Sequence, residues 1–329
     1  MSTDMGGGPS RREFVALGVG AFVVAALPLA ASRRDRVVRR TLPLMGTIAE
    51  VAVVDADVRR ANLAIDGAMQ ALRGVERTMS RFSQTSDVGR ANLTAARAPV
   101  RVGGETALVV TEALRWAAST DGAFDPAIGG AVALWDVTHR HEPPAAGAVQ
   151  RIAGRGLYRA IEVGTHAGEA VLRYHDADAR LDLGAIAKGY GVDRAAAALR
   201  DWGVRHALVN VGGDLYAIGT APDGDGWRIG IQDPDDDRRT IATLSVADAA
   251  VATSGTYQQF FRWRGRRYHH LLDPATAAPR ATGMQSLTIR AASCMHADAA
   301  ATALFGMSRV EAARVLARCA TDGAIMHSV

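Results

Sequence analysis

Cysteine and lysine are scarce in this chain of 329 residues. The 2 cysteines, Cys294 and Cys319, form no CxxC pair, which argues against a structural zinc site and a thioredoxin-like redox motif. An oxidising compartment would permit a disulfide between them, but the sequence does not determine whether they pair. The basic residues are almost all arginine, so Lys188 stands out within a segment rich in small residues.

A strong net charge is also lacking. The 38 basic and 34 acidic residues leave a net charge of +4, and the basic excess is spread along the chain. This distribution does not predict nucleic acid as a partner, because proteins that bind nucleic acid concentrate arginine and lysine on one face. Hydrophobic residues make up 48% of the sequence, so we expect a sizeable core and exclude the class of disordered proteins.

The long apolar run of the sequence lies near the N-terminus. It extends from Val15 to Ala31, is broken by glycines, and follows the paired Arg11 and Arg12. This order of basic, apolar and small residues is typical of a secretory signal, and the paired arginines indicate the twin-arginine type. A membrane anchor is the alternative, although the run is short and interrupted for that purpose.

From this pattern we expect a signal segment at residues 1–32 and the folded domain at residues 33–329. The protein would then be exported to the periplasm or the cell envelope. It would stay tethered to the membrane if the signal were not cleaved. Because no cysteine ends the apolar run, we do not expect a lipid anchor there.

Hydrophobic periodicity predicts helices early in the folded domain and strands late. A period of three to four residues indicates helices from Val58 to Met79 and from Glu105 to Ser119. A hairpin is expected from Ile161 to Tyr174, and a strand and turn at Leu181–Gly184 lead into a helix from Ala187 to Trp202. Further strands are expected at Ala207–Ile218, Trp227–Gln232, Ile241–Val246, Ala250–Thr253, Tyr268–Leu272 and Gln285–Arg290.

Two helices are expected near the C-terminus. The first covers Ala297 to Phe305, and the second begins at Ser308, where Glu311 completes a capping-box pattern. Helices followed by antiparallel strands predict an α+β fold. Because no repeat or linker divides the sequence, we expect one catalytic domain after the signal segment.

Asp298 and Thr302 are candidate metal ligands. They are four residues apart on an expected helix, so their side chains lie on one face. A carboxylate and a hydroxyl suit magnesium or calcium better than zinc. The alternative is a carboxylate that interacts with the helix dipole and a threonine that bonds back to a carbonyl, and the spacing alone favours this alternative.

Small residues surround two further candidate sites. The segment from Asp182 to Tyr190 has small residues where a strand turns into a helix, so its backbone could approach a phosphate, with Lys188 adding a positive charge. Tight packing explains this segment equally well, and neither GxxxxGK[ST] nor GxGxxG is present. Gly212 and Gly213, next to Asp214, indicate a turn or bulge, or a backbone that a ring or phosphate can approach.

The late strands carry hydroxyls and histidines. Thr253-Ser254-Gly255 could form a ligand loop, although a Ser/Thr-rich turn is the simpler interpretation. His269 and His270 precede Asp273-Pro274, and in an alternating strand they point to opposite sides. One of them could act as a general base, or both could be structural. No GxSxG or HExxH motif supports a hydrolase or a zinc protease.

Taken in this order, the segments resemble the ApbE family, the FAD:protein FMN transferases. The resemblance extends from Leu44 to Met307. It is carried by Met45-Gly46-Thr47, Met79-Ser80-Arg81-Phe82, Gly122-Ala123-Phe124-Asp125-Pro126, Leu134-Trp135, Asp182–Arg194, Asn210–Gly219, Ala252–Tyr257, Tyr268–Pro274 and Ala297–Phe305. Each motif is weak alone, but the ordered set is specific.

The resemblance implies a T-fold-like α+β domain with a defined set of site residues. Asp298 and Thr302 would bind Mg²⁺ together with a backbone carbonyl of the turn before the helix, for which we prefer Ala185. His270 matches the family's histidine before Asp-Pro and would be the base. The residues implied to bind FAD are Met45, which would pack on the isoalloxazine ring, and Lys188, Gly212, Gly213, Asp214, Thr253, Ser254 and Gly255.

Two positions depart from the family pattern. His269 stands where the family usually has serine or another small residue, so either histidine could be the base. Thr256 stands where an acidic residue is common, which leaves the details of the flavin or acceptor pocket open.

The implied reaction is a magnesium-dependent transfer of FMN from FAD to a threonine or serine hydroxyl of another protein, with release of AMP. The acceptors would be exported or membrane-bound redox proteins with a Ser/Thr-Gly-Ala/Ser-Thr motif. Two alternatives remain: an FAD pyrophosphatase that uses water in place of the acceptor, and a non-enzymatic protein that binds FAD.

Overall fold

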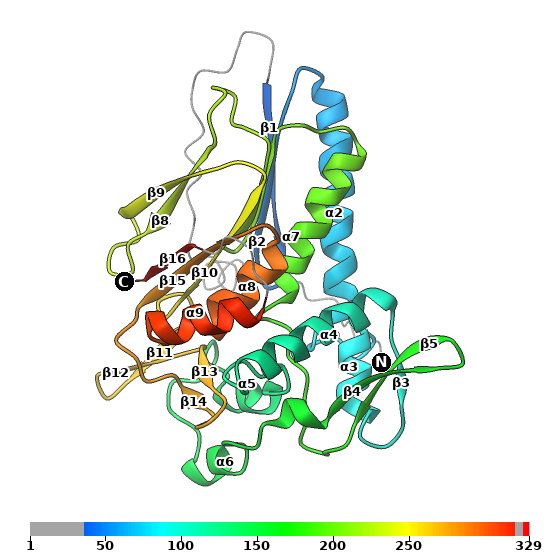
Figure 1. Ribbon diagram of the computed structural model, residues 1–329, viewed down its shortest axis with the longest axis vertical. Helices are drawn as coiled ribbons and strands as arrows, with labels where there is room; N and C mark the ends of the chain where they lie inside the picture. Colours follow the sequence, from blue (N-terminus) through cyan, green and yellow to red (C-terminus); the bar gives the residue numbers. More distant parts are fainter. Residues whose placement is uncertain (1–35, 320–324, 329) are drawn as a thin grey trace, which may run out of the picture.

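A seven-stranded sheet is the centre of the computed structural model, which describes residues 36–319 and 325–328 (Figure 1). The expected signal segment lies outside the described residues. All neighbouring strands of the sheet are antiparallel, in the order β1-β2-β6-β7-β10-β15-β16. Their bounds are β1 Arg36–Leu44, β2 Thr47–Asp55, β6 Ala207–Val211, β7 Asp214–Ile218, β10 Ala249–Gly255, β15 Ser286–Ala291 and β16 Ile325–Ser328.

Two long helices pack side by side against one face of this sheet (Figure 1). Helix α2 (Val58–Met79) begins at Asp57, whose carboxylate accepts hydrogen bonds from the first backbone N–H groups. Helix α7 (Ala187–Asp201) follows the small-residue turn and ends before Gly203, which has a φ of 73°. The apolar residues that recur with a helical period along α2 are all buried, namely Ile65, Met69, Leu72, Val75 and Met79.

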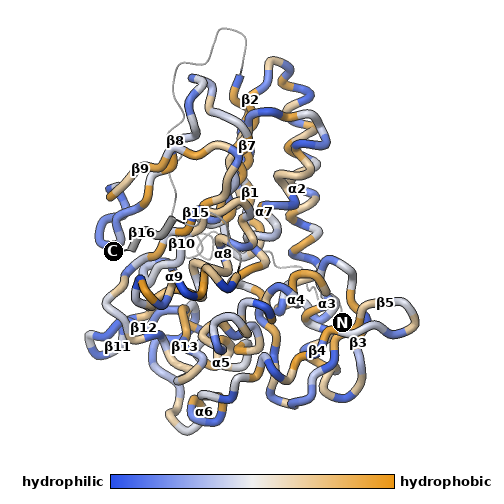
Figure 2. Tube along the Cα trace, in the orientation of Figure 1, coloured by the Kyte–Doolittle hydropathy of each residue, from blue (hydrophilic) through white to orange (hydrophobic). Residues whose placement is uncertain are grey.

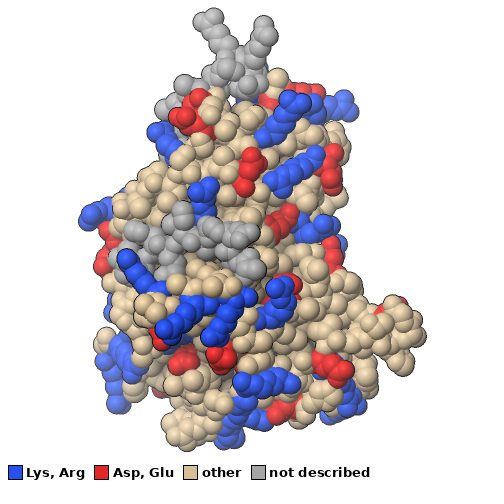
Figure 3. Space-filling model, viewed as in Figure 1, with Lys and Arg blue, Asp and Glu red and all other residues tan. Residues whose placement is uncertain are grey.

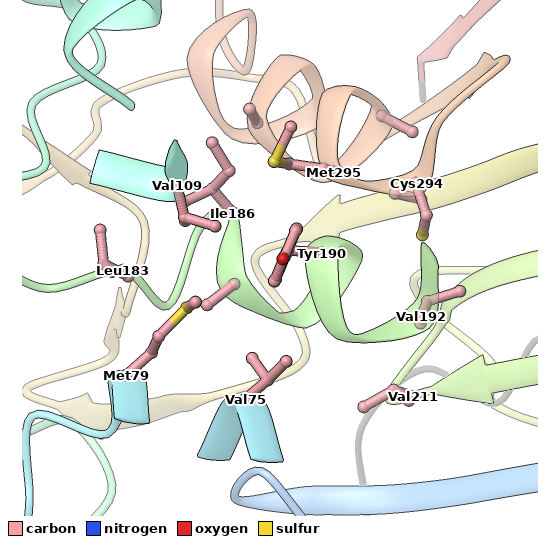
Figure 4. Packing of buried hydrophobic residues seen from close by; sticks show 14 of the residues in the cluster. Val75, Met79, Val109, Leu183, Ile186, Tyr190, Val192, Val211, Cys294 and Met295 are labelled. Atoms are coloured by element: carbon pink, nitrogen blue, oxygen red, sulfur yellow. The ribbon is translucent and has the colours of Figure 1, made fainter. Parts of the chain in front are cut away.

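Helix α8 (Cys294–Ala303) lies against α7 and against β10 and β15. Figure 4 shows side chains from four helices pointing toward one another, among them Met79 of α2, Val109 of α4, Tyr190 of α7 and Met295 of α8. This packing buries Asp298 of α8 within the protein, whereas His296 and Thr302 of the same helix stay partly exposed.

A second group of elements lies at the lower end of the view in Figure 1. Its helices are α3 Asp87–Thr94, α4 Gly104–Ser119, α5 Gly129–Trp135 and α6 Ala146–Gln150, with a 3₁₀ turn at Leu157–Ala160. A three-stranded sheet is formed by β3 Val100–Arg101, β5 Glu169–Tyr174 and β4 Ile161–His166. The remaining elements are β8 Trp227–Gln232, β9 Thr240–Val246, β11 Phe260–Trp263, β12 Arg266–His269, β13 Leu272–Asp273, β14 Ala278–Pro279 and α9 Arg309–Arg318.

Apolar residues concentrate where the helices meet the central sheet, and polar residues line the outward sides (Figure 2). This mixture of helices and antiparallel sheets confirms the predicted α+β class. Within the part of the chain that the structure describes, no helix has the length and apolarity needed to cross a membrane.

Several local predictions were wrong. The segment at Leu181–Gly184 is not a strand, because Arg180 forms only an isolated bridge and a turn follows directly. The strand expected at 207–218 is two strands, since Gly212 and Gly213 adopt positive φ and reverse the chain. Helix α8 begins before Ala297, because Ser293 caps it. Strands β1, β11 and β16 were not anticipated.

Gly189 allows α7 and α8 to approach each other closely. A Cβ atom at this position would lie 2.2 Å from the Cys294 carbonyl oxygen and 2.8 Å from Cβ of Asp298. Both are closer than non-bonded heavy atoms allow, and the carbonyl belongs to the backbone. Any side chain at position 189 would therefore push α8 away from α7.

We expect Gly189→Ala to lower the free energy of unfolding by about 1–3 kcal/mol, as overpacking in a core does. The matched control is Gly74→Ala in α2, where a Cβ would meet only the flexible end of Arg77 at 3.9 Å. Alanine there is expected to be neutral or stabilising, because it favours the helix. Urea unfolding measures both, and equal stability of the two variants would contradict the close approach.

Candidate active site

One lysine and two carboxylates meet where α7, β7 and α8 converge. Lys188 is the single lysine of the sequence, and its Nζ lies 2.7 Å from Oδ2 of Asp214 and 3.2 Å from Oδ1 of Asp298. Nζ also donates a hydrogen bond of 3.2 Å to the carbonyl of Gly184 in the turn before α7. Both aspartates are 3% exposed and so removed from bulk water, whereas the Lys188 side chain is 28% exposed and reaches the solvent boundary.

The charged groups of the cluster shift one another's pKa values. Burial and, after it, the negative charge of Asp298 raise the pKa of Asp214 to about 7, although Lys188 opposes the rise. Burial favours a lower pKa for Lys188, but attraction to the two carboxylates outweighs it and the pKa is raised. Two carboxylates therefore share one ammonium group, and a second cation would be attracted to the cluster.

Two hydroxyls extend the cluster along α8. Thr302 lies one turn after Asp298, and its Oγ1 is 3.2 Å from Oγ of Ser254 at the end of β10. Ser254 is 6% exposed. The hydroxyl of Thr253 pairs at 2.9 Å with that of Thr288 on the neighbouring strand, while its backbone N–H lies close enough to the Asp214 carboxylate to lower the pKa of that group. Thr253 thus joins strands through its side chain and meets the site through its backbone, whereas Ser254 meets the site through its hydroxyl.

The expected flavin-binding turns lie close to the start of α7. Met45 is in the β1–β2 turn with a φ of 54°, and its sulfur is 3.1 Å from the place where a Cβ of Gly191 would be. Gly212, in the β6–β7 turn, lies against Thr47, since a Cβ there would be 2.7 Å from the threonine hydroxyl. The two turns therefore meet, and Gly213 follows in the same turn. Ala185 lies in the turn that precedes α7.

The adjacent histidines have different surroundings. His269 is 7% exposed and lies edge-on to the ring of Phe305, with ring centroids 6.4 Å apart. Burial lowers its pKa to about 4, and the charges of Arg267 and Arg280 contribute in the same direction. Its Nδ1 atom has no hydrogen-bond partner among the described residues. This environment indicates a packed, neutral histidine.

His270 follows β12 and is half-buried. Its Nδ1 lies 3.3 Å from the carbonyl of Gln259. A carbonyl only accepts, so this contact favours a proton on Nδ1 and leaves Nε2 able to accept one. Desolvation lowers the pKa of His270 to about 4, and the charge of Lys188 contributes in the same direction, which relates this ring to the ionic cluster.

Three supporting residues were not predicted from the sequence. The carboxylate of Asp193 accepts hydrogen bonds from the Ser293 hydroxyl at 2.7 Å and the backbone N–H of Cys294 at 2.8 Å, which holds the start of α8 on α7. The N–H of Gly189 donates to Oδ2 of Asp298 at 3.0 Å. Glu76 accepts from the N–H of Met45 at 2.7 Å. Gly189 and Asp193 both lie in the Asp182–Arg194 motif that the sequence had singled out, whereas Glu76 lies in none of the motifs.

The donor set fits a hard divalent cation. Asp298 offers a carboxylate, Thr302 a hydroxyl, and the turn at Ala185 backbone carbonyls, which are the oxygen ligands that Mg²⁺ prefers. Oδ2 of Asp214 is buried and lacks a hydrogen bond of good geometry, although the ammonium is near. Within the described ranges no group of three or more His, Cys, Asp and Glu side chains could hold a metal.

Comparison with known proteins identifies the family. The model of the ApbE family matches residues 45–326. The chain belongs to the ApbE family. It is 33% identical over 270 residues to an FAD:protein FMN transferase of Vibrio cholerae, covering 80% of each chain. A second FAD:protein FMN transferase, from Treponema pallidum, is 33% identical over 288 residues, which is 83% of this chain and 79% of that one.

Solved structures agree with this assignment. The ApbE protein of Thermotoga maritima superposes with a TM-score of 0.79 at 29% identity, covering 89% of this chain and 94% of that chain. The flavin transferase ApbE of Vibrio cholerae gives a TM-score of 0.75 at 29% identity, covering 90% and 97%. These matches confirm the predicted fold class and the interpretation of the chain as a transferase of this family.

Both histidines are expected to stay neutral throughout the physiological range. Since the pKa values of His269 and His270 are lowered to about 4, neither ring should gain a proton as the pH falls from 8 to 5.5. Nitrogen-15 NMR of the imidazoles, assigned with His269→Gln and His270→Gln, tests this. Titration of either ring with a midpoint above pH 6 would contradict the described environments.

Proposed function

We propose that this protein transfers FMN from FAD to a threonine or serine hydroxyl of an acceptor protein, with Mg²⁺ as cofactor and AMP as the leaving group. The observation that carries the proposal is the buried cluster of Lys188, Asp214 and Asp298. It combines a cationic phosphate ligand with hard-oxygen metal ligands, beside a histidine that can accept a proton. The names of the Vibrio and Treponema relatives support the same reaction.

Some residues of the site would bind the metal ion, and others would bind FAD. Asp298, Thr302 and the Ala185 carbonyl would hold Mg²⁺, which neutralises charge on a diphosphate when bound. Lys188 donates hydrogen bonds to phosphate oxygens. Thr47 fills the space that a side chain at Gly212 would occupy, so the backbone of Gly213 in the same turn is the part that would allow close approach of the flavin or its phosphate.

The chemistry requires one proton transfer. The acceptor hydroxyl forms a bond to the FMN-side phosphorus, the bond from that phosphorus to the bridging oxygen breaks, and AMP leaves with that oxygen. Nε2 of His270 takes the hydroxyl proton. His270 is unprotonated at neutral pH because its pKa is lowered. The negative diphosphate beside the ring favours the protonated form as the reaction proceeds.

We further propose that the protein is exported through a twin-arginine signal at residues 1–32. The support is the sequence pattern at Arg11-Arg12 together with a flavin-binding fold, since the twin-arginine pathway suits proteins that fold before export. The enzyme would thus cross the membrane with FAD already bound.

Asp298→Ala is expected to reduce flavin transfer by at least about 100-fold, because it removes a carboxylate from the site that neutralises the diphosphate. The assay incubates the wild-type protein with FAD, Mg²⁺ and a peptide that contains Ser-Gly-Ala-Thr. Mass spectrometry then measures the FMN attached to the peptide. Chelation of Mg²⁺ should abolish the product. Mg²⁺ should also raise the Tm of the wild type but not of Asp298→Ala.

The matched control is Asp201→Ala, since Asp201 is an exposed aspartate at the end of α7. It should retain both transfer and the Mg²⁺-dependent rise in Tm. Free FMN with no flavinylated peptide would favour the FAD pyrophosphatase. FAD binding with no turnover in the wild type would favour a non-enzymatic flavoprotein.

Replacing Arg11 and Arg12 together by lysine is expected to leave the enzyme in the cytoplasm, because the twin-arginine pathway reads the arginine pair as an address. Cell fractionation with antibody detection measures the distribution. Lysine preserves the positive charge, so it leaves a general secretory signal intact. Normal amounts of the double variant in the periplasm would refute the twin-arginine assignment.

A further inference from the structure

Arginine is concentrated on the hairpin of β11 and β12, contrary to the even spread expected from the sequence. Arg262, Arg264, Arg266 and Arg267 lie within six residues, interleaved with aromatic side chains. Figure 3 shows blue side chains gathered at the lower left, where Figure 1 places this hairpin. Among the described residues, no carboxylate lies within ion-pair distance of these four arginines, although many other arginines of the chain are paired.

Two of these arginines face each other directly. Arg262 of β11 is opposite Arg267 of β12 in the register, so both side chains project from the same face. Their guanidinium groups lie 5.7 Å and 4.7 Å from the ring centroid of Phe260 on that face. Like charges opposite each other destabilise a strand pair. An anionic ligand bound between them would remove this repulsion.

The other face anchors the hairpin to the body of the protein. Tyr268 stacks between Phe261 at 5.2 Å and Trp135 at 5.7 Å. Phe261 is 6% exposed and Trp135 is 5% exposed. The hairpin is therefore held in place mainly through this face, and at its base also through His269 of the opposite face, which packs on Phe305. Arg262 and Phe260 remain exposed on the opposite face, with Phe260 at 36%.

This exposed face is continuous with the candidate active site. Nη1 of Arg267 donates to Oγ1 of Thr256 at 3.4 Å, two residues beyond Ser254. Thr256 is neutral and does not offset the charge. His270 directly follows β12, three residues or roughly 10 Å along the chain after Arg267, and this odd separation would put the two side chains on opposite faces of an extended strand, so the face is linked to the site through Thr256.

We propose that Arg262, Arg267 and Phe260 form a docking face for the acceptor, which binds carboxylate side chains next to the hydroxyl that receives FMN. This inference rests on the proposed function, since it names where the acceptor of that reaction binds. Guanidinium groups bind carboxylates with two parallel hydrogen bonds, and the Phe260 ring gives an apolar contact beside them. An acceptor segment whose hydroxyl reaches His270 has its carboxylates about three residues away.

The orientation of this exposed face favours a protein segment over a lipid membrane as its ligand. Arg262 and Arg267 share the face that leads to Thr256, so a bound chain continues toward the reacting atoms. A lipid surface would require the aromatic side chains to project together into solvent, whereas Phe261 and Tyr268 are used for packing. An acidic polypeptide segment is therefore the occupant that the geometry favours.

The test uses two fluorescein-labelled peptides that differ only in charge. Both contain Ser-Gly-Ala-Thr, preceded in one by Asp-Glu-Asp and in the other by Asn-Gln-Asn. Fluorescence anisotropy with the full chain should give a Kd about five- to tenfold lower for the acidic peptide at low salt. High salt should remove this preference, because it screens partly exposed charges. Equal Kd values at low salt would overturn the proposal.

Two variants test which residues of the protein are responsible for the preference for the acidic peptide. Arg262→Gln should bring the two Kd values within about twofold, while FAD affinity stays unchanged and Tm stays equal or rises as the repulsion is removed. Arg228→Gln is the matched control on the distant strand β8, where Arg228 is also exposed, and it should keep the preference. Retention of the preference in Arg262→Gln would overturn the assignment to this face. The proposal would also be overturned if the wild type bound phosphatidylglycerol vesicles but showed no preference between the peptides, and if Arg262→Gln abolished the vesicle binding.

The same peptides separate this inference from the proposed function. Equal flavinylation and equal binding of both peptides would leave the transferase standing and reject the docking face. If the protein bound the acidic peptide more tightly but flavinylated neither peptide, the docking face would stand and the transferase would be rejected. Faster flavinylation of the acidic peptide, lost in Arg262→Gln, supports both.

Discussion

The buried contact between α7 and α8 is the constraint on which the site depends. Gly189 brings the two helices within backbone contact, and Asp193 holds the first turn of α8 by accepting three hydrogen bonds. As a result Asp298 sits against the N–H of Gly189 and the ammonium of Lys188. A buried ionic cluster of this kind costs desolvation free energy, and it persists only where the surrounding packing holds its members together.

That contact also explains why the site combines residues that are far apart in the sequence. The turn before α7 supplies carbonyls, β7 supplies Asp214, β10 supplies Ser254 and α8 supplies Asp298 with Thr302. The antiparallel order β7-β10-β15 places β10 between its two neighbours, and α8 covers β10 and β15. The proposed phosphate ligands and metal ligands thus lie on rigid elements, which suits a phosphoryl transfer that relies on positioning.

The adjacent histidines show how a departure from the family pattern is accommodated. His269 occupies a buried position beside Phe305, where it is neutral and packed, so its presence does not create a second exposed base. His270 keeps Nε2 able to accept a proton and directly follows β12. The same hairpin carries Arg262 and Arg267, and this links the proposed base to the proposed docking face for the acceptor.

Local pattern in the sequence was sufficient to determine the α+β class, the limits of α2, the hairpin of β4 and β5, and the capping box at Ser308, because these depend on interactions between residues near one another in the chain. The ordered motifs also identified the family and most candidate site residues. Only the tertiary structure decided that Thr253 joins strands while Ser254 meets Thr302, and that Asp193, Glu76 and Gly189 support the site. It also placed Arg262 opposite Arg267. Strand register and helix packing set these contacts, and no short-range spacing in the sequence encodes them.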